Sequence, residues 1–291
     1  MLVVSIGEVL WDIFGDEKRL GGASANFLWH SRQFGADVEL ISAVGDDDNG
    51  REIIDILHGN CIGTDCVEIL DFPTGIVNVV LDDSGKPTYD IVEGSAWDNI
   101  SVDADNKNLV AKADVIHFGS LAQRNHVTAY SIKQLLNSAS KECIIVFDIN
   151  LRQSYYNKEI IQDSLELATI LKLSDEELPV VSDYFSILGE TVSEQLQNLL
   201  GMFNFHLIAY TCGPNGSMLV TDSEIDIHPG CPGNAVNSVG AGDSFLAALT
   251  AGIIRGDSLA EINDFANRVA TFVCSQDGAT PVLPDDVLSS T

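Results

Sequence analysis

The clearest chemical signal in this 291-residue chain is a run of small residues and one acid near its end, Gly240-Ala241-Gly242-Asp243. An apolar segment follows, which predicts a buried helix with this run as its first turn. Glycines let backbone N–H groups approach a ligand, and the start of a helix favours an anion. A carboxylate there would repel a resting phosphate, but it is suited to take a proton from a hydroxyl that attacks phosphorus. The alternative is an acid that complements the helix dipole.

A second group of polar residues lies near the front of the chain. Asp12 is embedded in an apolar stretch after the opening strand, and Gly21-Gly22 precede a predicted helix at about 23–34 that carries Asn26 one turn in. Two such hydrogen-bonding side chains beside a glycine pair suit a polyol better than an anion. Turn capping by Asp12 and ordinary turn glycines remain the alternatives.

The elements that position these residues alternate between strand and helix. Apolar strands are expected at about 38–44, 114–118, 143–147 and 206–210, with helices between them. The alternation predicts an α/β fold with a mainly parallel central sheet and helices on both faces. Polar clusters follow strand after strand, so the ligand crevice is expected at the carboxyl edge of the sheet. Strands within 66–92, with another at about 13–19, predict a small antiparallel flap.

Composition excludes several classes of protein. An apolar content of 45% rules out a disordered chain, and there is no basic leader and no apolar run of about 18 residues. A cytoplasmic protein without a membrane partner is therefore expected. The net charge of −28 opposes binding to nucleic acid or to an anionic membrane, although a solvating acidic surface also explains it. Six scattered cysteines and isolated histidines argue against zinc.

Three familiar phosphate-binding patterns are missing. The chain has no G-x-x-x-x-G-K-[ST] loop, and the H-R-D and D-F-G pair of protein kinases does not occur. The dinucleotide pattern G-x-G-x-x-G fails at Gly240 because Phe245 stands at its third small position. A phosphate would have to be held by another device.

Ordered segments along the chain resemble the ribokinase-like (phosphofructokinase-B) sugar kinases. They are Gly21-Gly22-Ala-x-Ala-Asn26, Val44-Gly45-Asp46-Asp47, Pro73-Thr74-Gly75, Asp148-x-Asn150-x-Arg152, Lys172-x-x-x-x-Glu177, Thr211-x-Gly213-x-x-Gly216, GAGDSF from Gly240, and Gly278-Ala279-Thr280-Pro281. One GxGD is weak evidence, but these matches follow the family's order over about residues 3–284. Segments 7–12 and 147–152 look most like those of bacterial fructokinases.

The resemblance implies one ribokinase-like domain over residues 1–291. That domain is a three-layer sandwich with a mainly parallel sheet and a small β-sheet lid, formed here by about 13–20 and 66–92. The lid would close over the sugar and exclude water, which otherwise competes as acceptor. Family lids often pair with a second subunit, so a homodimer is expected.

The resemblance also implies catalytic roles. Asp243 matches the base that deprotonates the sugar's primary hydroxyl, and the amides of Gly240, Ala241 and Gly242 match the anion hole for the γ-phosphoryl group. Arg152 lies near the transfer site, where it could neutralise charge.

Binding roles follow from the same matches. Asp12, Gly22 and Asn26 match sugar-binding positions, and Glu177 matches the acid that organises Mg²⁺ through water. The nucleotide-binding positions are matched by Thr211, Gly213, Gly216 and Asn267, the last in the helix that borders the adenine pocket.

Two positions depart from the family's pattern. Asn237-Ser238 replaces the usual Asp-Thr, whose carboxylate often helps to hold a monovalent cation, so activation by K⁺ stays open. Ser174 stands where Asn is usual, which could shift the metal–water network.

These matches predict an ATP-dependent sugar kinase that phosphorylates a primary hydroxyl, with fructose O6 favoured. A kinase for ribose, 2-keto-3-deoxygluconate or a nucleoside is the alternative among enzymes. A sugar-binding relative that has lost catalysis is the alternative from another class.

Overall fold

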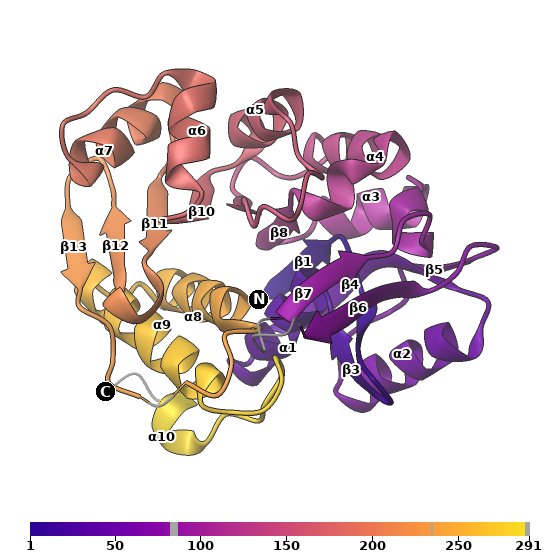
Figure 1. Ribbon diagram of the computed structural model, residues 1–291. Coiled ribbons are helices and arrows are strands. Elements are labelled where there is room, and N and C mark those ends of the chain that lie inside the picture. The colour runs from indigo at the N-terminus through magenta and orange to yellow at the C-terminus, as the bar shows by residue number, and fades with distance from the viewer. Residues whose placement is uncertain (82–86, 234, 289–291) are drawn as a thin grey trace.

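The strands form two separate sheets in the computed structural model, which describes residues 1–81, 87–233 and 235–288 (Figure 1). The large sheet consists, in spatial order, of β13 (Ile225–His228), β12 (Ser217–Val220), β11 (Leu207–Thr211), β10 (Ile170–Ser174), β9 (Ile144–Asp148), β8 (Val115–Gly119), β1 (Leu2–Ile6), β4 (Asp37–Gly45) and β5 (Val67–Leu70). Neighbouring strands from β11 to β5 are parallel, whereas β12 and β13 join antiparallel. The expected mainly parallel sheet is confirmed.

Helices cover both faces of this sheet, because alternate side chains of each strand point to opposite faces. On β1, Val3 belongs to one apolar cluster and Val4 to the other. The cluster around Val3 includes residues of α1 (Ala23–Gln33), α2 (Asp48–Gly59), α8 (Ala241–Arg255) and α9 (Leu259–Cys274). The cluster around Val4 includes residues of α3 (Ala104–Val110), α4 (His126–Leu136), α5 (Lys158–Leu167), α6 (Leu178–Phe185) and α7 (Val192–Phe203). The result is the predicted three-layer sandwich.

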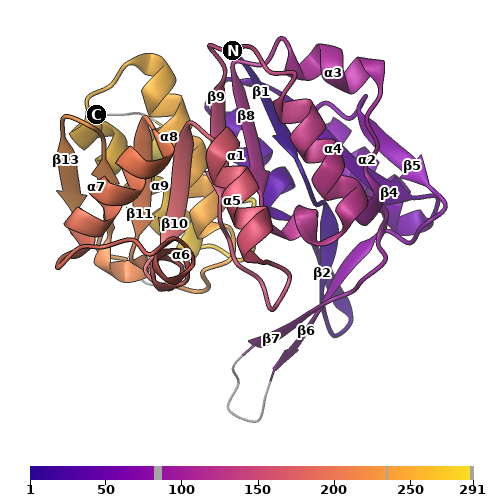
Figure 2. The ribbon, with the colours of Figure 1, turned by 90° about the horizontal axis from the view of Figure 1, so that it is seen from above.

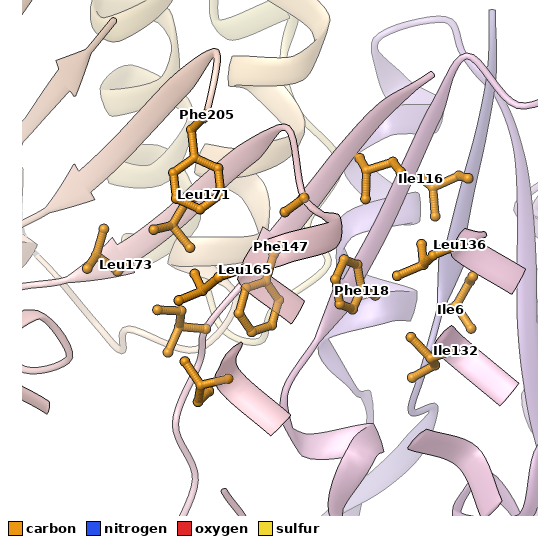
Figure 3. Close-up of a cluster of buried hydrophobic side chains, with 14 of the residues drawn as sticks. Ile6, Ile116, Phe118, Ile132, Leu136, Phe147, Leu165, Leu171, Leu173 and Phe205 are labelled. Carbon is orange, nitrogen blue, oxygen red and sulfur yellow. The ribbon is translucent and has the colours of Figure 1, made fainter. Parts of the chain in front are cut away.

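The cluster around Val4 shows how the helices pack on the sheet. Phe118 of β8 and Phe147 of β9 stack with ring centroids 5.0 Å apart, and Ile132 and Leu136 of α4 lie over the neighbouring strands (Figure 3). Continuous apolar runs such as residues 144–147 fit strands that are covered on both faces. A short helix, α10 (Asp285–Leu288), ends the described chain, and none of the described helices has the length and apolarity needed to cross a bilayer.

The small sheet has the order β3 (Glu17–Gly21), β2 (Leu10–Phe14), β6 (Gly75–Leu81) and β7 (Pro87–Ile91). In Figure 2 its strands β6 and β7 project away from the body of the molecule. The expected antiparallel pairing is found between β2 and β3 and between β6 and β7, whereas β2 and β6 pair in parallel. The turn expected at 82–87 falls mostly outside the described residues.

One strand assigned to the flap belongs elsewhere. The predicted lid range of about 66–92 is wrong at its start, because β5 pairs in parallel with β4 at the edge of the large sheet, with Ser42 opposite Val67. Its backbone groups are satisfied by β4, which continues the parallel order. The connection from β5 to β6 then crosses from the large sheet to the small one.

Helix α8 is buried along most of its length, from Asp243 to Gly252. Its first turn is fixed by Gly240, which has a φ of 77° as the residue before the helix. That left-handed conformation disfavours any residue with a Cβ, and a Cβ here would also lie 2.7 Å from that of Ala279. Small residues let α8 pack between α1 and α9 (Figure 1).

A buried ion pair anchors the base of the small sheet. Arg124 donates to both oxygens of Asp98 at 2.7 and 2.8 Å and to the carbonyl oxygen of Val92, just beyond β7, at 2.6 Å. The guanidinium also lies over the ring of Trp97, 4.1 Å from its centroid. Both charged side chains are buried, with exposed fractions of 4% and 2%.

Replacing Asp98 with asparagine should therefore lower the free energy of unfolding by about 3 kcal/mol, because the Arg124 charge is left buried without its partner. Chemical denaturation monitored by circular dichroism measures this. The matched control is Asp163→Asn, which breaks the exposed Lys133–Asp163 pair and should change stability little. Equal effects of the two substitutions would contradict the anchor.

Candidate active site

A cavity of about 550 Å³ lies where β1, β9 and β10 end, beside the first turn of α8. The sequence-predicted residues that line it are Asp12, Gly22, Asn26, Arg152, Glu177, Gly240, Gly242 and Asp243. Val77, Tyr89 and Ile91 of the small sheet line it too. Two predicted groups of polar residues, one from each end of the chain, thus share one cavity at the carboxyl edge of the sheet.

Asp243 is held at the boundary between the cavity and the core. Its Oδ2 accepts a hydrogen bond of 2.8 Å from Nδ2 of Asn26, and the residue is 8% exposed. Burial raises the pKa of Asp243 to about 6, with help from the nearby charge of Asp148, while the hydrogen bond from Asn26 and the charges of Lys172 and Arg152 act in the opposite direction. A pKa of about 6 leaves the Asp243 carboxyl group mostly ionised near neutral pH, as a general base must be.

Backbone amides surround the start of the same helix. The N–H of Ala241 donates to the carbonyl oxygen of Ser238 at 3.3 Å, so it is partly used by the turn. The amides of Gly240, Gly242 and Asp243 donate to no acceptor within the part of the chain that the structure describes. Unpaired donors at a helix start attract an anion.

The front of the chain brings two carboxyl groups to the cavity. Burial raises the pKa of Asp12 to about 6, where the Arg152 charge opposes the shift and Asp243 adds to it. Burial raises the pKa of Glu8 to about 7, although backbone hydrogen bonds, including one from the amide of Ala23 at 3.2 Å, oppose the shift. The protonation of these two carboxyl groups, and with it the charge at this end of the cavity, therefore depends on the pH and on the charge of a bound substrate.

The glycine pair allows the chain to pass close to the Asp12 carboxylate and to the backbone of Glu8. A Cβ at Gly21 would overlap the carboxylate of Asp12. Gly22 has a φ of 99°, and a Cβ there would overlap the carbonyl oxygen of Glu8. The two glycines are therefore required by close packing at the cavity wall.

Glu8, Asp148 and Lys172 are among the cavity residues that were given no role from sequence. Nζ of Lys172 lies 3.0 Å from Oδ1 of Asp148, and both side chains are buried. Burial acts to lower the pKa of Lys172, but the charges of Asp148 and Glu177 outweigh it and the pKa is raised. The available signal was position, since Glu8 and Asp148 stand where buried strands end.

Glu177 fixes the backbone on two sides of the cavity. Its Oε1 accepts from the amide of Leu151 at 2.9 Å and its Oε2 from the amide of Ser174 at 2.7 Å. The carboxylate thereby joins the segment after β9 to the end of β10. In the described residues, no three His, Cys, Asp or Glu side chains are grouped as a metal site.

The other expected residues do not line this cavity: Ala241, Thr211, Gly213, Gly216 and Asn267. Thr211 ends β11, and Gly213 begins a short 3₁₀ helix, η3 (Gly213–Asn215). Asn267 lies in α9, where its Nδ2 donates to Oγ of Ser217 at 2.7 Å and to the carbonyl oxygen of Asn263 at 2.8 Å. The bond to Ser217 ties α9 to β12, which gives Asn267 a structural role.

Comparison with known proteins gives this arrangement a family. The model of the pfkB family carbohydrate kinases matches residues 4–286, which is nearly the whole chain. The chain belongs to the pfkB family of carbohydrate kinases. It is therefore a sugar kinase, a phosphotransferase with a sugar hydroxyl as acceptor, and the expected family is confirmed.

Relatives of this carbohydrate kinase differ in how much is known of their substrates. The chain is 29% identical to the putative sugar kinase PH1459 of Pyrococcus horikoshii, over 96% of this chain and 91% of the relative. It is 25% identical to fructokinase-2 of rice, over 97% and 91%. A fructokinase of Xylella fastidiosa with bound ATP has the same fold, with a TM-score of 0.86 at 20% identity over 99% and 97% of the two chains.

Replacing Glu8 with glutamine should make this kinase more stable at pH 8 but not at pH 5. In the folded state the pKa of Glu8 is raised from 4.5 to about 7. The free energy of unfolding therefore decreases as the pH rises from about 4.5 to 7, because Glu8 must then be ionised in its buried position, and the loss is complete above pH 7. Removing that charge should add on the order of 2–3 kcal/mol to the free energy of unfolding at pH 8.

Urea denaturation of the ligand-free protein at both pH values measures this difference. The control is Glu159→Gln on the exposed face of α5, which should behave like the wild type at each pH. A stability gain that is the same at pH 5 and pH 8 would contradict the burial of an ionisable Glu8.

Proposed function

We propose that this kinase transfers the γ-phosphoryl group of ATP to the primary hydroxyl of a neutral sugar, most favourably O6 of fructose. The proposal is supported by the position of Asp243 beside the amides of Gly240 and Gly242, which have no acceptor among the described residues, at one cavity with Asp12 and Asn26. A hydroxyl held by Asp12 and Asn26 would lie between a base and an anion hole. That is the arrangement which in-line phosphoryl transfer needs.

The charge of the cavity favours a neutral sugar. Glu8, Asp12 and Asp243 surround the end where the sugar is expected, and Arg152 is the nearby cation that acts on all three carboxyl groups. An anionic sugar such as 2-keto-3-deoxygluconate would meet repulsion there. The similarity to rice fructokinase-2 supports fructose among neutral sugars. Ribose and nucleosides remain the alternatives that a direct assay separates.

In the proposed reaction Asp243 takes the proton of the attacking hydroxyl, and Asn26 holds the carboxylate in place through the bond to Oδ2. The amides of Gly240, Gly242 and Asp243 receive the phosphoryl oxygens as charge develops. Arg152 reduces the negative charge at the transfer site. The side-chain Oδ1 of Asn26 is buried and has no partner among the described residues, so it can accept from a sugar hydroxyl.

Mg²⁺ fits the acidic side of the cavity. Oδ2 of Asp148 is buried and has no partner among the described residues, and carboxylate oxygen is the ligand that Mg²⁺ prefers. Asp148, together with Glu177 acting through water, would hold the ion. When bound, it would neutralise part of the charge on the phosphates. At Asn237, which replaces the acid that often helps to hold a monovalent cation in the family, Oδ1 accepts from the amide of Val239 at 3.0 Å and Nδ2 donates to the carbonyl oxygen of Gln276 at 3.1 Å.

We place the rest of ATP towards Thr211, Gly213, Gly216 and Asn267, beyond the amides of α8. The small sheet is proposed as the lid, since Val77, Tyr89 and Ile91 line the cavity and Nε2 of Gln153 donates to the carbonyl oxygen of Tyr89 at 2.6 Å. We also propose that two subunits form a homodimer through this sheet. A cytoplasmic location is proposed because the cysteines are free, and free thiols persist in that compartment.

Replacing Asp243 with asparagine should lower kcat about 10²–10⁴-fold, because the hydroxyl loses its base while the shape of the site is kept. Isothermal titration should give dissociation constants for fructose and ATP close to those of the wild type. The control is Asp55→Asn on the exposed side of α2, which should leave turnover unchanged. Near-normal turnover of Asp243→Asn would refute the role of this residue.

The acceptor is identified by a coupled ADP-release assay over fructose, ribose, 2-keto-3-deoxygluconate and a nucleoside, with and without K⁺. The proposal expects fructose to have the highest kcat/KM and 2-keto-3-deoxygluconate to be poor because of the three carboxyl groups near the sugar. A clear preference for the anionic substrate would overturn the charge argument. Binding without turnover on every acceptor would favour a non-catalytic relative.

The pH dependence of kcat/KM should show an acid limb near pH 6. Asp243 works as a base only when ionised, and its raised pKa of about 6 moves this requirement upwards from the usual 3.8. Below the limb, the rate should fall about tenfold per pH unit. Asp12 titrates in the same range and contributes to the same limb. The residual activity of Asp243→Asn is therefore the reference, and it should fall less steeply than that of the wild type as the pH is lowered. A flat profile down to pH 4.5 in folded protein would contradict this.

A further inference from the structure

The turn that follows β9 contacts the outer edge of the small sheet. In the strand order of this sheet β7 stands last, beside β6, so its other edge faces away from its partner. Nε2 of Gln153 donates to the carbonyl oxygen of Tyr89 on that edge at 2.6 Å. The hydroxyl of Tyr155 donates to the carbonyl oxygen of Ile91 at 3.3 Å and to Oε1 of Glu93 at 2.9 Å. Two side chains that are two positions apart thus bind two carbonyl groups that are two positions apart on one strand.

The sheet held by these bonds carries residues of the sugar end of the cavity. Asp12 of β2 stands opposite Val77 of β6, and Val77 stands opposite Ile91 of β7. Directly opposed residues place their side chains on the same face of a sheet, and all three line the cavity. Contacts at the outer edge of β7 therefore act on a row of side chains that includes the proposed sugar carboxylate, Asp12.

The same turn carries Arg152, which also lines the cavity. The N–H of Tyr155 donates to the carbonyl oxygen of Arg152 at 3.1 Å and closes the turn. Gln153, between them, is exposed and has a φ of 48°. This left-handed conformation favours glycine, so the backbone gives no reason for a glutamine here. The contact of its side chain with the sheet supplies one.

We propose that Gln153 and Tyr155 are positioning residues, which hold the outer edge of β7 against the turn of Arg152 and so align the sugar with the transfer site. The inference rests on the proposed kinase reaction and concerns its acceptor side. Without these bonds the row formed by Asp12, Val77 and Ile91 is less firmly held over the cavity, and the sugar is bound more weakly. The proposed ATP site lies on α8 and beyond β11, outside the small sheet, so binding of ATP should change little.

The competing explanation is structural. The outer edge of a sheet presents unpaired backbone groups, and side chains of the turn could simply cover them. That role predicts a loss of stability with unchanged KM values. A positioning role predicts a rise in the KM of the sugar that ATP does not share, so the two explanations differ in their kinetics.

The experiment compares the wild type with Gln153→Met, Tyr155→Phe and the double variant. Methionine keeps the length of the glutamine side chain but lacks the N–H donor. Phenylalanine keeps the ring, whose centroid lies 4.8 Å from the Arg124 guanidinium, but lacks the hydroxyl. The double variant should raise the KM for fructose at least about threefold and change the KM for ATP less than about twofold, because each lost bond contributes modestly.

The matched control is Gln162→Met on the exposed side of α5, where the glutamine bonds to Glu166 of the same helix. Its KM values should equal those of the wild type. A smaller rise in the fructose KM of the double variant, or an equal rise in both KM values, would overturn the proposal. Melting curves identify folded variants, and Gln153→Met at its exposed position replaces the double variant if that protein does not fold, with a fructose KM at least about twofold above that of the wild type as its expected result.

Hydrogen exchange of the ligand-free protein tests the contact independently of the reaction. The N–H of Val92, just beyond β7, donates to the carbonyl oxygen of Ile76 at 3.0 Å, so exchange in residues 87–92 reports how firmly β7 is held on β6. The double variant should exchange these amides at least about threefold faster, and Gln162→Met should not. Unchanged exchange would overturn the positioning role. If the wild type phosphorylates none of the four acceptors, the kinase proposal fails, and this measurement still decides whether the turn holds the sheet.

Discussion

The site depends on one hydrogen bond between the two ends of the chain. Nδ2 of Asn26 on α1 donates to Oδ2 of Asp243 on α8 at 2.8 Å, although 217 residues separate them. The bond requires the two helices to pack closely, which small residues permit, and it holds the carboxylate at the cavity instead of leaving it to cap its own helix. Burial that follows from the same packing raises the pKa of Asp243 to about 6.

Other charged side chains lie around that carboxylate, most of them acidic. Asp148 and Lys172 form a buried pair on one side, and Glu177 is fixed by two backbone amides nearby. An acidic wall of this kind suits a hydroxyl acceptor and a metal-bound phosphate, and it disfavours free anions. The amides at the start of α8 are the proposed site for a phosphoryl group.

Sequence patterns predicted the parts of this arrangement that local chemistry controls. Gly240, the residue before helix α8, has the positive φ that its position needs, and Asp12 of β2 and Asn26 of α1 line the same cavity. The pairing of β5 with β4 was missed because a short strand of this type has two possible partners. Helix α6 was missed, and the burial of Glu8 and the Asn267 network depend on side chains distant in sequence, which a local pattern does not contain.

The most direct test of the central claim is a crystal structure of the wild type with fructose, ADP and aluminium fluoride. The account predicts that O6 of fructose lies about 2.6–3.2 Å from a carboxylate oxygen of Asp243, within hydrogen-bonding distance, with the fluoride ligands at the amides of Gly240 and Gly242. A sugar bound with every hydroxyl beyond the reach of Asp243 would contradict it.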